Sequence, residues 1–129
     1  MKFQIVLVLF VALSGCATAP APAPYWQHET MKVTGFGVAP QFSRPAQKKL
    51  MAERAAKVNA VRELFLQVRM LPVDKSSRVS DYLPSQWTPK NFTVESVLYS
   101  PDGTCKAILT MSLEKVWGLV AQYKQQATN

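Results

Sequence analysis

One cysteine near the start of the chain follows an apolar run, and its thiol is the group best placed to do chemistry. The run Phe3 to Leu13 is apolar apart from one glutamine, and Lys2 precedes it. A positive residue before an apolar segment of this length is typical of an export signal, and the segment is too short to cross a bilayer as a helix. Leu13 to Cys16 reads Leu-Ser-Gly-Cys, the order of a bacterial lipobox, whose cysteine sulfur takes a diacylglyceryl group before cleavage on its N-terminal side. We therefore expect Cys16 to be the lipidation site and the first residue of the mature chain.

Two other fates of this segment stay open. Ala17 to Ala19 is itself an Ala-x-Ala sequence, so an ordinary signal peptidase could cut after Ala19 and release a soluble periplasmic protein. An uncleaved membrane anchor would need a longer apolar segment. Lipidation is the preferred interpretation because a lipobox requires four residue types in a fixed order. Acyl chains that each bury many CH₂ groups would then hold the protein permanently at the membrane. Ala17 is not aspartate, which favours sorting to the periplasmic face of the outer membrane.

No other group of residues in the sequence has the spacing of a catalytic or metal site. His28 is the only histidine, and it lies in the predicted tether, where a general base could not be held in place. No pair of cysteines or histidines stands at ligand spacing. Once Cys16 is lipidated, Cys105 has no partner for a disulfide, and its strand-like surroundings predict a buried, inert thiol. We expect no enzymatic activity, no cofactor and no metal.

Length and composition allow one modest domain on a tether. Removing the first 15 of 129 residues leaves 114, with 14 basic and 8 acidic residues and a net charge of +6. Ala17 to Pro24 is of low complexity, with proline at every second position from Pro20, and predicts an extended spacer reaching about 25 Å at most. We assign residues 1–15 to a signal peptide, 16–30 to a lipidated Ala/Pro-rich tether and 31–126 to a single domain. Tyr25 and Trp26 end the tether and could contact lipid, a neighbouring chain or this domain. Packing on the domain is the preferred alternative.

The clearest periodicity predicts a helix from about residue 45 to 70. Pro45 suits a first helical position, and Pro72 stops the pattern. At roughly 1.5 Å per residue this helix is about 39 Å long, more than a domain of this size usually buries, so we expect one end to contact something else. Apolar residues at three- and four-residue steps predict the buried stripe: Met51, Ala55, Val58, Val61, Leu64, Phe65, Val68 and Leu71.

Strand patterns before and after this helix predict an α+β domain. Met31 to Val38 alternates partly and carries two glycines, which indicates a bulge or a closely packed helix. Phe92 to Tyr99 is rich in β-forming residues, and Cys105 to Leu113 alternates. Between them stands Ser-Pro-Asp-Gly, the residues of a type I turn with a G1 bulge, so the segment predicts a hairpin. Glu114 to Gln126 predicts a short C-terminal helix. The order is strand-helix-strand-strand, with a small antiparallel sheet packed on one long helix.

The stretch Pro72 to Asn91 lacks a clear periodicity. A structureless segment of that length in a compact domain is often functional or interfacial. We therefore predict an exposed interface there, with Tyr82, Leu83 and Trp87 as its apolar contacts.

The helix sequence resembles that of a known family. Ala52 to Val68 reads AERAAKVNAVRELFLQV, and together with the Asp-Gly hairpin and the lipobox it resembles the Lpp-twenty outer-membrane lipoproteins, in particular their flagellar assembly members. The resemblance implies a strand-helix-strand-strand domain that assembles into large rings or discs beneath the outer membrane, around the flagellar motor. Family members usually have glycine after the long helix, where this chain has Met-Leu-Pro.

These observations together predict a non-enzymatic lipoprotein on the periplasmic face of the outer membrane. The resemblance implies a homo-oligomer that is a structural or assembly component of the flagellar basal body, is required for motility and has flagellar motor proteins as candidate partners. The alternative is a general envelope lipoprotein that binds a protein or lipopolysaccharide without a flagellar role. The basic charge also suits nucleic acid, but aromatic residues are not interleaved with the basic residues of the helix, so phosphates of lipopolysaccharide or the membrane are the expected counterions.

Overall fold

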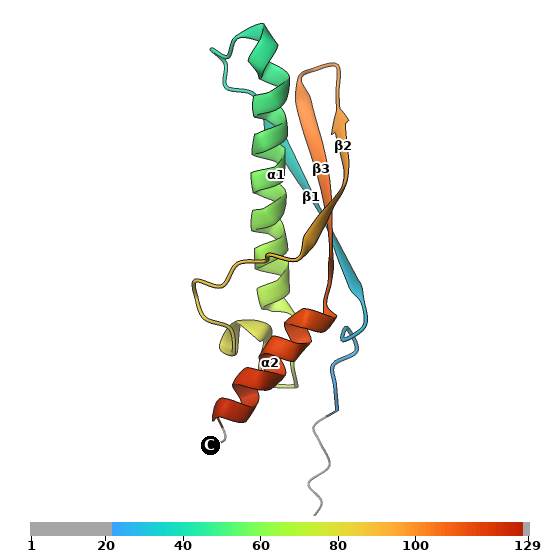
Figure 1. Ribbon diagram of the computed structural model, residues 1–129, viewed down its shortest axis with the longest axis vertical. Helices are drawn as coiled ribbons and strands as arrows, with labels where there is room; N and C mark the ends of the chain where they lie inside the picture. The colour runs from blue at the N-terminus through green and yellow to red at the C-terminus, as the bar shows by residue number, and fades with distance from the viewer. Residues whose placement is uncertain (1–21, 128–129) are drawn as a thin grey trace, which may run out of the picture.

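The computed structural model describes residues 22–127 as a three-stranded antiparallel sheet with a long helix on one face and a short helix at one end (Figure 1). The predicted α+β class and the strand-helix-strand-strand order are confirmed. The predicted signal peptide and Cys16 lie outside the described residues. The elements are β1 (Thr30–Val38), α1 (Pro45–Met70), the 3₁₀ turn η1 (Val79–Asp81), β2 (Phe92–Tyr99), β3 (Thr104–Ser112) and α2 (Glu114–Ala127).

The sheet places its last strand in the centre. The strand order is β1-β3-β2, so β1 and β2 are both edge strands and both run antiparallel to β3. A bulge interrupts β2 between Val94 and Ser96. The hairpin turn forms as predicted: Gly103 has a positive φ of 88°, and its N–H donates to the Ser100 carbonyl at 3.0 Å. The Thr104 N–H donates to the Asp102 carboxylate at 2.9 Å, which lowers the pKa of Asp102.

The contact between α1 and β1 is a contact between backbones. Gly35 and Gly37 face the helix, and alanines of α1 lie directly over them with almost no exposed surface. A methyl group on Gly35 would come within 2.6 Å of the Ala60 Cα atom, and one on Gly37 within 2.8 Å of the Ala55 carbonyl carbon. Only glycine therefore fits at these two strand positions. The buried stripe of α1 consists of Ala52, Ala56, Ala60, Leu64 and Val68.

The predicted stripe of α1 is therefore wrong in its N-terminal half. Met51 and Val58, predicted as buried, are 36% and 61% exposed. The apolar periodicity selected the larger side chains, whereas a surface carrying two glycines accepts only small ones. The prediction holds for Leu64 and Val68, where β1 diverges from α1 and leaves room for longer side chains (Figure 1).

The first two turns of α1 lie beyond the packed part of the sheet. Every residue from 45 to 51 is exposed, and the helix extends past the β2–β3 hairpin turn (Figure 1). This agrees with the expectation that a helix of this length exceeds what the domain can bury.

The end of the domain that carries α2 is closed by residues far apart in sequence. Trp26 is 1% exposed; its indole N–H donates to the Pro72 carbonyl at 2.7 Å, and its ring meets Trp117 edge-on, with centroids 6.0 Å apart. The folded unit therefore takes in more of the chain than the predicted domain 31–126. Val79, Val116 and Val120 complete this part of the core.

Cys105 lies on β3 with no exposed surface, as the strand pattern predicts. Burial raises the pKa of its thiol, so little thiolate forms near neutral pH. The described fold gives Cys105 a packing role.

Replacing either strand glycine should test the close contact between α1 and β1. We expect Gly35→Ala and Gly37→Ala each to lower the free energy of unfolding by about 3 kcal/mol or more, because the added methyl group meets helix backbone that cannot move aside alone. The measurement is the midpoint of chemical denaturation. Gly118→Ala is the matched control: a methyl group at this exposed position of α2 meets nothing within 4 Å and should raise stability by about 0.5–1 kcal/mol. Wild-type stability in both strand variants would contradict the packing.

Candidate functional site

An almost entirely apolar groove lies between α1 and β2. The helix packs chiefly on β1 and β3, so β2 extends beyond the part of the sheet that the helix covers (Figure 1). The resulting hollow has a volume of about 300 Å³ and an almost entirely apolar lining. We call it the α1–β2 groove; it is lined by Lys57, Val58, Val61, Phe92 and Val94.

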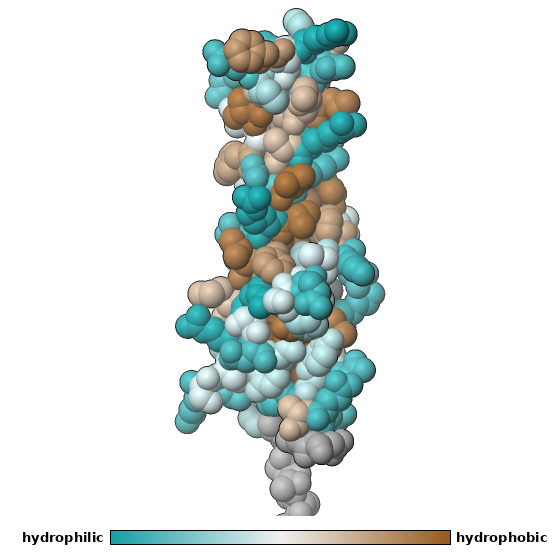
Figure 2. All heavy atoms as spheres, turned by 90° about the vertical axis from the view of Figure 1, so that its left-hand side faces the viewer, coloured by the Kyte–Doolittle hydropathy of each residue, from teal (hydrophilic) through white to brown (hydrophobic). Residues whose placement is uncertain are grey.

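Apolar side chains continue from this groove along the outer surface of α1. Figure 2 shows hydrophobic side chains scattered between polar ones along the helix, with large hydrophobic residues at its exposed positions. Five large apolar residues of one helix remain at least one-third exposed. These residues are Leu50, Met51, Val58, Leu66 and Met70. Apolar residues scattered singly over a polar surface are normal, so this face of α1 does not by itself mark an interface.

The two sheet edges differ in how far they are occupied. On β1, the side-chain amide of Asn59 donates to the Phe36 carbonyl at 2.6 Å, so a side chain from α1 takes one main-chain acceptor of that edge. The β2 edge carries the bulge, and Val94 beside it is 40% exposed. An unpaired edge next to an apolar hollow is the arrangement by which a second chain can add contacts through both backbone and side chains.

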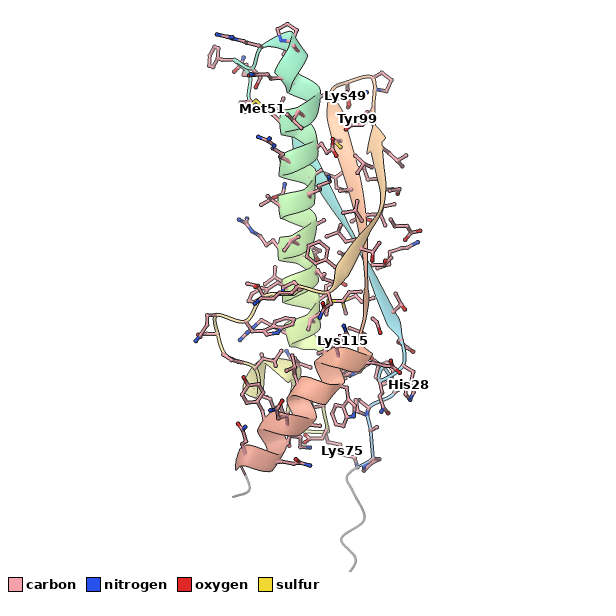
Figure 3. The ribbon with its side chains drawn as sticks, in the orientation of Figure 1. His28, Lys49, Met51, Lys75, Tyr99 and Lys115 are labelled. Atoms are coloured by element: carbon pink, nitrogen blue, oxygen red, sulfur yellow. The ribbon has the colours of Figure 1, made fainter. Side chains whose placement is uncertain are left out.

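Polar contacts close the groove at its hairpin end. The Tyr99 hydroxyl donates to a Glu53 carboxylate oxygen at 2.5 Å, and Lys57 pairs with the other oxygen of that carboxylate at 2.8 Å. The ammonium of Lys49 lies 4.4 Å from the centroid of the Tyr99 ring (Figure 3). The hydrogen bonds from Lys57 and Tyr99 lower the pKa of Glu53, and the bond to Glu53 raises the pKa of Tyr99 to about 12. Both pKa shifts are consequences of the contacts that join α1 to β2 at this end of the groove.

The predicted interface residues of the long loop are placed differently from expectation. Leu83 is 5% exposed and belongs to the core, so the prediction of an exposed Leu83 is wrong. Tyr82 is half-buried, with its hydroxyl 3.2 Å from the Ser77 hydroxyl. Trp87 stacks on Phe65 with centroids 6.4 Å apart and lines a pocket. The loop folds back on the domain, and of the three predicted residues Trp87 lines an open hollow.

His28 is held in place by a contact that the sequence did not predict. Its Nδ1 atom lies 2.8 Å from a carboxylate oxygen of Glu114, and both side chains are mostly exposed. The pair joins the segment before β1 to the first turn of α2, on the surface of the domain (Figure 3). The groove and the β2 edge were missed as a site because their residues come from α1 and a strand about thirty positions later.

Two further findings concern the described part of the chain, and a third concerns similarity to known proteins. No helix within residues 22–127 combines the length and apolar character needed to cross a membrane. Across the same residues, no three histidine, cysteine or acidic side chains gather where they could hold a metal ion. The chain matches no protein-family model, no curated protein and no solved structure.

Proposed function

We propose that this protein is an outer-membrane-anchored periplasmic lipoprotein that assembles with copies of itself and serves as a structural or assembly component of a flagellar basal body. The observation that supports self-assembly most strongly is the α1–β2 groove beside the open β2 edge. The flagellar setting rests on the resemblance of the helix sequence to the flagellar assembly lipoprotein FlgP of the Lpp-twenty family.

The direction of the tether limits how such copies could associate. The chain enters the domain at the end that carries α2, opposite the hairpin turn (Figure 1). Copies anchored through Cys16 to one membrane surface would all point the same way, so their symmetry axis would stand perpendicular to that surface. Each copy would then offer its α1–β2 groove to one neighbour and its β1 side to the other. A contact between two different surfaces generates a ring when the rotation closes.

The strand directions suit this arrangement. Since β1 and β2 both run antiparallel to β3, they run parallel to each other. Copies standing side by side would bring the β2 edge of one next to the β1 edge of the next in parallel orientation. The neighbour's α1 lies over its own β1, which would bring that helix towards the open groove. Confinement to a membrane surface raises the effective concentration, so individually weak contacts suffice.

A second candidate function is a general envelope lipoprotein that binds another protein or lipopolysaccharide. The observation that favours it is the excess of basic over acidic residues in the chain from Cys16 onward, 14 against 8. The phosphates of lipopolysaccharide would be suitable counterions for a domain held below the outer membrane.

Removing the lipid acceptor should release the protein from the membrane. We expect Cys16→Ala to appear in the soluble periplasmic fraction, because the acyl chains carried by this cysteine are the proposed membrane anchor. The measurement is fractionation of a detergent-free lysate, together with the intact mass of the wild-type product, which should correspond to an acylated chain beginning at Cys16. Recovery of the variant in the outer membrane, or an unmodified wild-type product starting at Pro20, would disprove the anchor.

Placing charge in the groove should prevent assembly without unfolding the domain. We expect Val58→Glu and Val94→Lys to convert the assembled protein into monomers, because each change puts an ionised group where a neighbouring copy would exclude water. Both residues are at least 40% exposed in the single chain, so the denaturation midpoint should hardly move. Phe42→Glu is the matched control, since Phe42 is 95% exposed and lies outside the groove. Crosslinking and light scattering of detergent extracts measure the size; unchanged assemblies in the groove variants would argue against this surface.

Deletion of the gene separates the two candidate functions. We expect the deletion strain to lose swimming while its outer membrane remains a barrier to large antibiotics, because a basal-body component acts in motility alone. Complementation with wild type, but not with Val58→Glu, should restore swimming. Normal swimming with intact motors, accompanied by a leaky envelope, would favour the general envelope function.

A further inference from the structure

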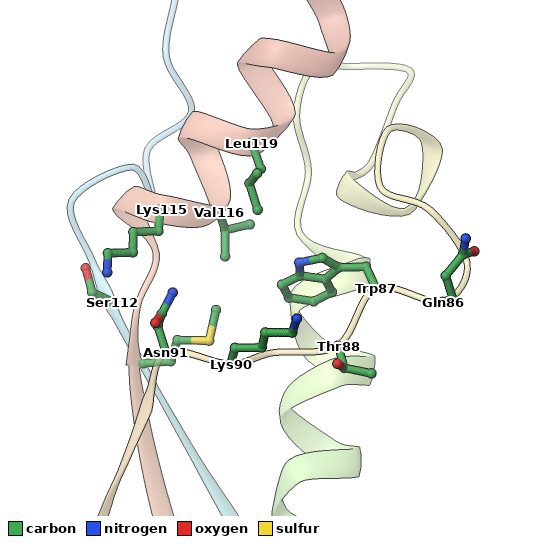
Figure 4. A pocket seen from close by; sticks show the side chains of 10 residues that line it. Gln86, Trp87, Thr88, Lys90, Asn91, Ser112, Lys115, Val116 and Leu119 are labelled. Atoms are coloured by element: carbon green, nitrogen blue, oxygen red, sulfur yellow. The ribbon is translucent and has the colours of Figure 1, made fainter.

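A second hollow lies at the opposite end of β2 from the hairpin turn and has a different character from the α1–β2 groove. Its volume is about 350 Å³, and it lies between the end of the long loop, the end of β3 and the first turns of α2 (Figure 4). Trp87, Val116 and Leu119 supply apolar walls, while Lys90 and Lys115 stand at its sides. The volume is at the lower end of the range of about 300–1,000 Å³ that is typical of small-molecule sites.

The aromatic wall of this pocket is fixed by contacts outside it. Trp87 stacks on Phe65 of α1 with an angle of 20° between the rings, and its backbone N–H donates to the Pro84 carbonyl at 3.0 Å. Pro89, two residues later, is buried. The indole is thus held in position before any ligand arrives, which reduces the entropy lost on binding.

The charge of the lining is entirely positive. Lys90 and Lys115 are its only charged residues, and within residues 22–127 neither ammonium forms an ion pair or a side-chain hydrogen bond. Glu114, next to Lys115 in sequence, is directed instead to His28. Two unpaired ammonium groups beside an apolar wall favour a ligand that is negatively charged at one end and apolar at the other.

We propose that this pocket binds a phosphate ester with a short apolar body: its apolar part lies against Trp87, and the exposed side chains of Lys90 and Lys115 turn in from opposite sides of the pocket to hold its phosphate (Figure 4). The side-chain amide of Asn91 lies at the same opening and adds a donor for a phosphate oxygen (Figure 4). Such a group could belong to an anionic lipid or to a soluble ester. The site depends neither on lipidation nor on assembly, so it can be tested whatever the outcome for the proposed function.

The test uses the indole signals of the full chain, isotope-labelled and held in non-ionic detergent. Hexyl phosphate should shift the Trp87 indole N–H signal saturably, with half-saturation below about 1 mM, while the Trp26 and Trp117 signals stay in place and report an intact fold. Lys90→Gln and Lys115→Gln should each weaken binding roughly tenfold, because each removes one charge-assisted hydrogen bond. Lys75→Gln, in an exposed turn away from the pocket (Figure 3), is the matched control and should bind like wild type.

Several outcomes would overturn the site. No shift of the Trp87 signal would do so, as would equal binding by the two pocket variants and the control. Equal affinity for inorganic phosphate would reduce the site to a simple anion contact, and equal affinity for hexanol would remove any role of the lysines. Adding dihexanoyl phosphatidylglycerol to the micelles, with dihexanoyl phosphatidylcholine as the neutral comparison, identifies the source: displacement of hexyl phosphate by the anionic lipid alone assigns a lipid headgroup, and its absence assigns a soluble ester.

Discussion

The direct contact between the backbones of α1 and β1 determines where the rest of the domain can lie. Gly35 and Gly37 present no side chains, and Ala56 lies over both of them, so the helix sits closer to this strand than any larger residue would permit. Such a contact stabilises the fold mainly through many short-range dispersion interactions, and the area of apolar surface that it buries adds little. It fixes the helix over one edge of the sheet, because only β1 carries the glycines.

The open side of the sheet follows from that off-centre position. A helix above the middle of three strands would cover β2 as well, whereas this one leaves Phe92 and Val94 beside a hollow. The contact between Glu53 and Tyr99 ties α1 to β2 at the hairpin end without filling the space below. The surface proposed for assembly and the packing that stabilises the monomer therefore have the same origin.

Short-range sequence patterns predicted the helices and strands. Features that depend on contacts between residues distant in sequence were not predicted. The hairpin and the limits of α1 were predictable because turn residues and prolines act within a few positions. The buried face of α1 was not, because periodicity weighs residues by hydrophobicity, and Val58 outweighs Ala56 until the partner surface is known. Glycines two apart and alanines four apart were the available signal. Leu83 was mistaken for an exposed contact because nothing in its neighbourhood shows that the loop folds back onto the core.

The burial of Trp26 has a mechanical consequence for a domain held by its N-terminal end. A pull on that end would reach the first pair of β1 and β3, Thr30 and Ser112, and could separate the strands one hydrogen bond at a time, the weakest way to load an antiparallel pair. Trp26 stands before that pair, with its indole bonded to Pro72 and packed against Trp117. Force on the tether would therefore be carried first by the helix–loop end of the core, and the sheet would remain paired until that indole is extracted.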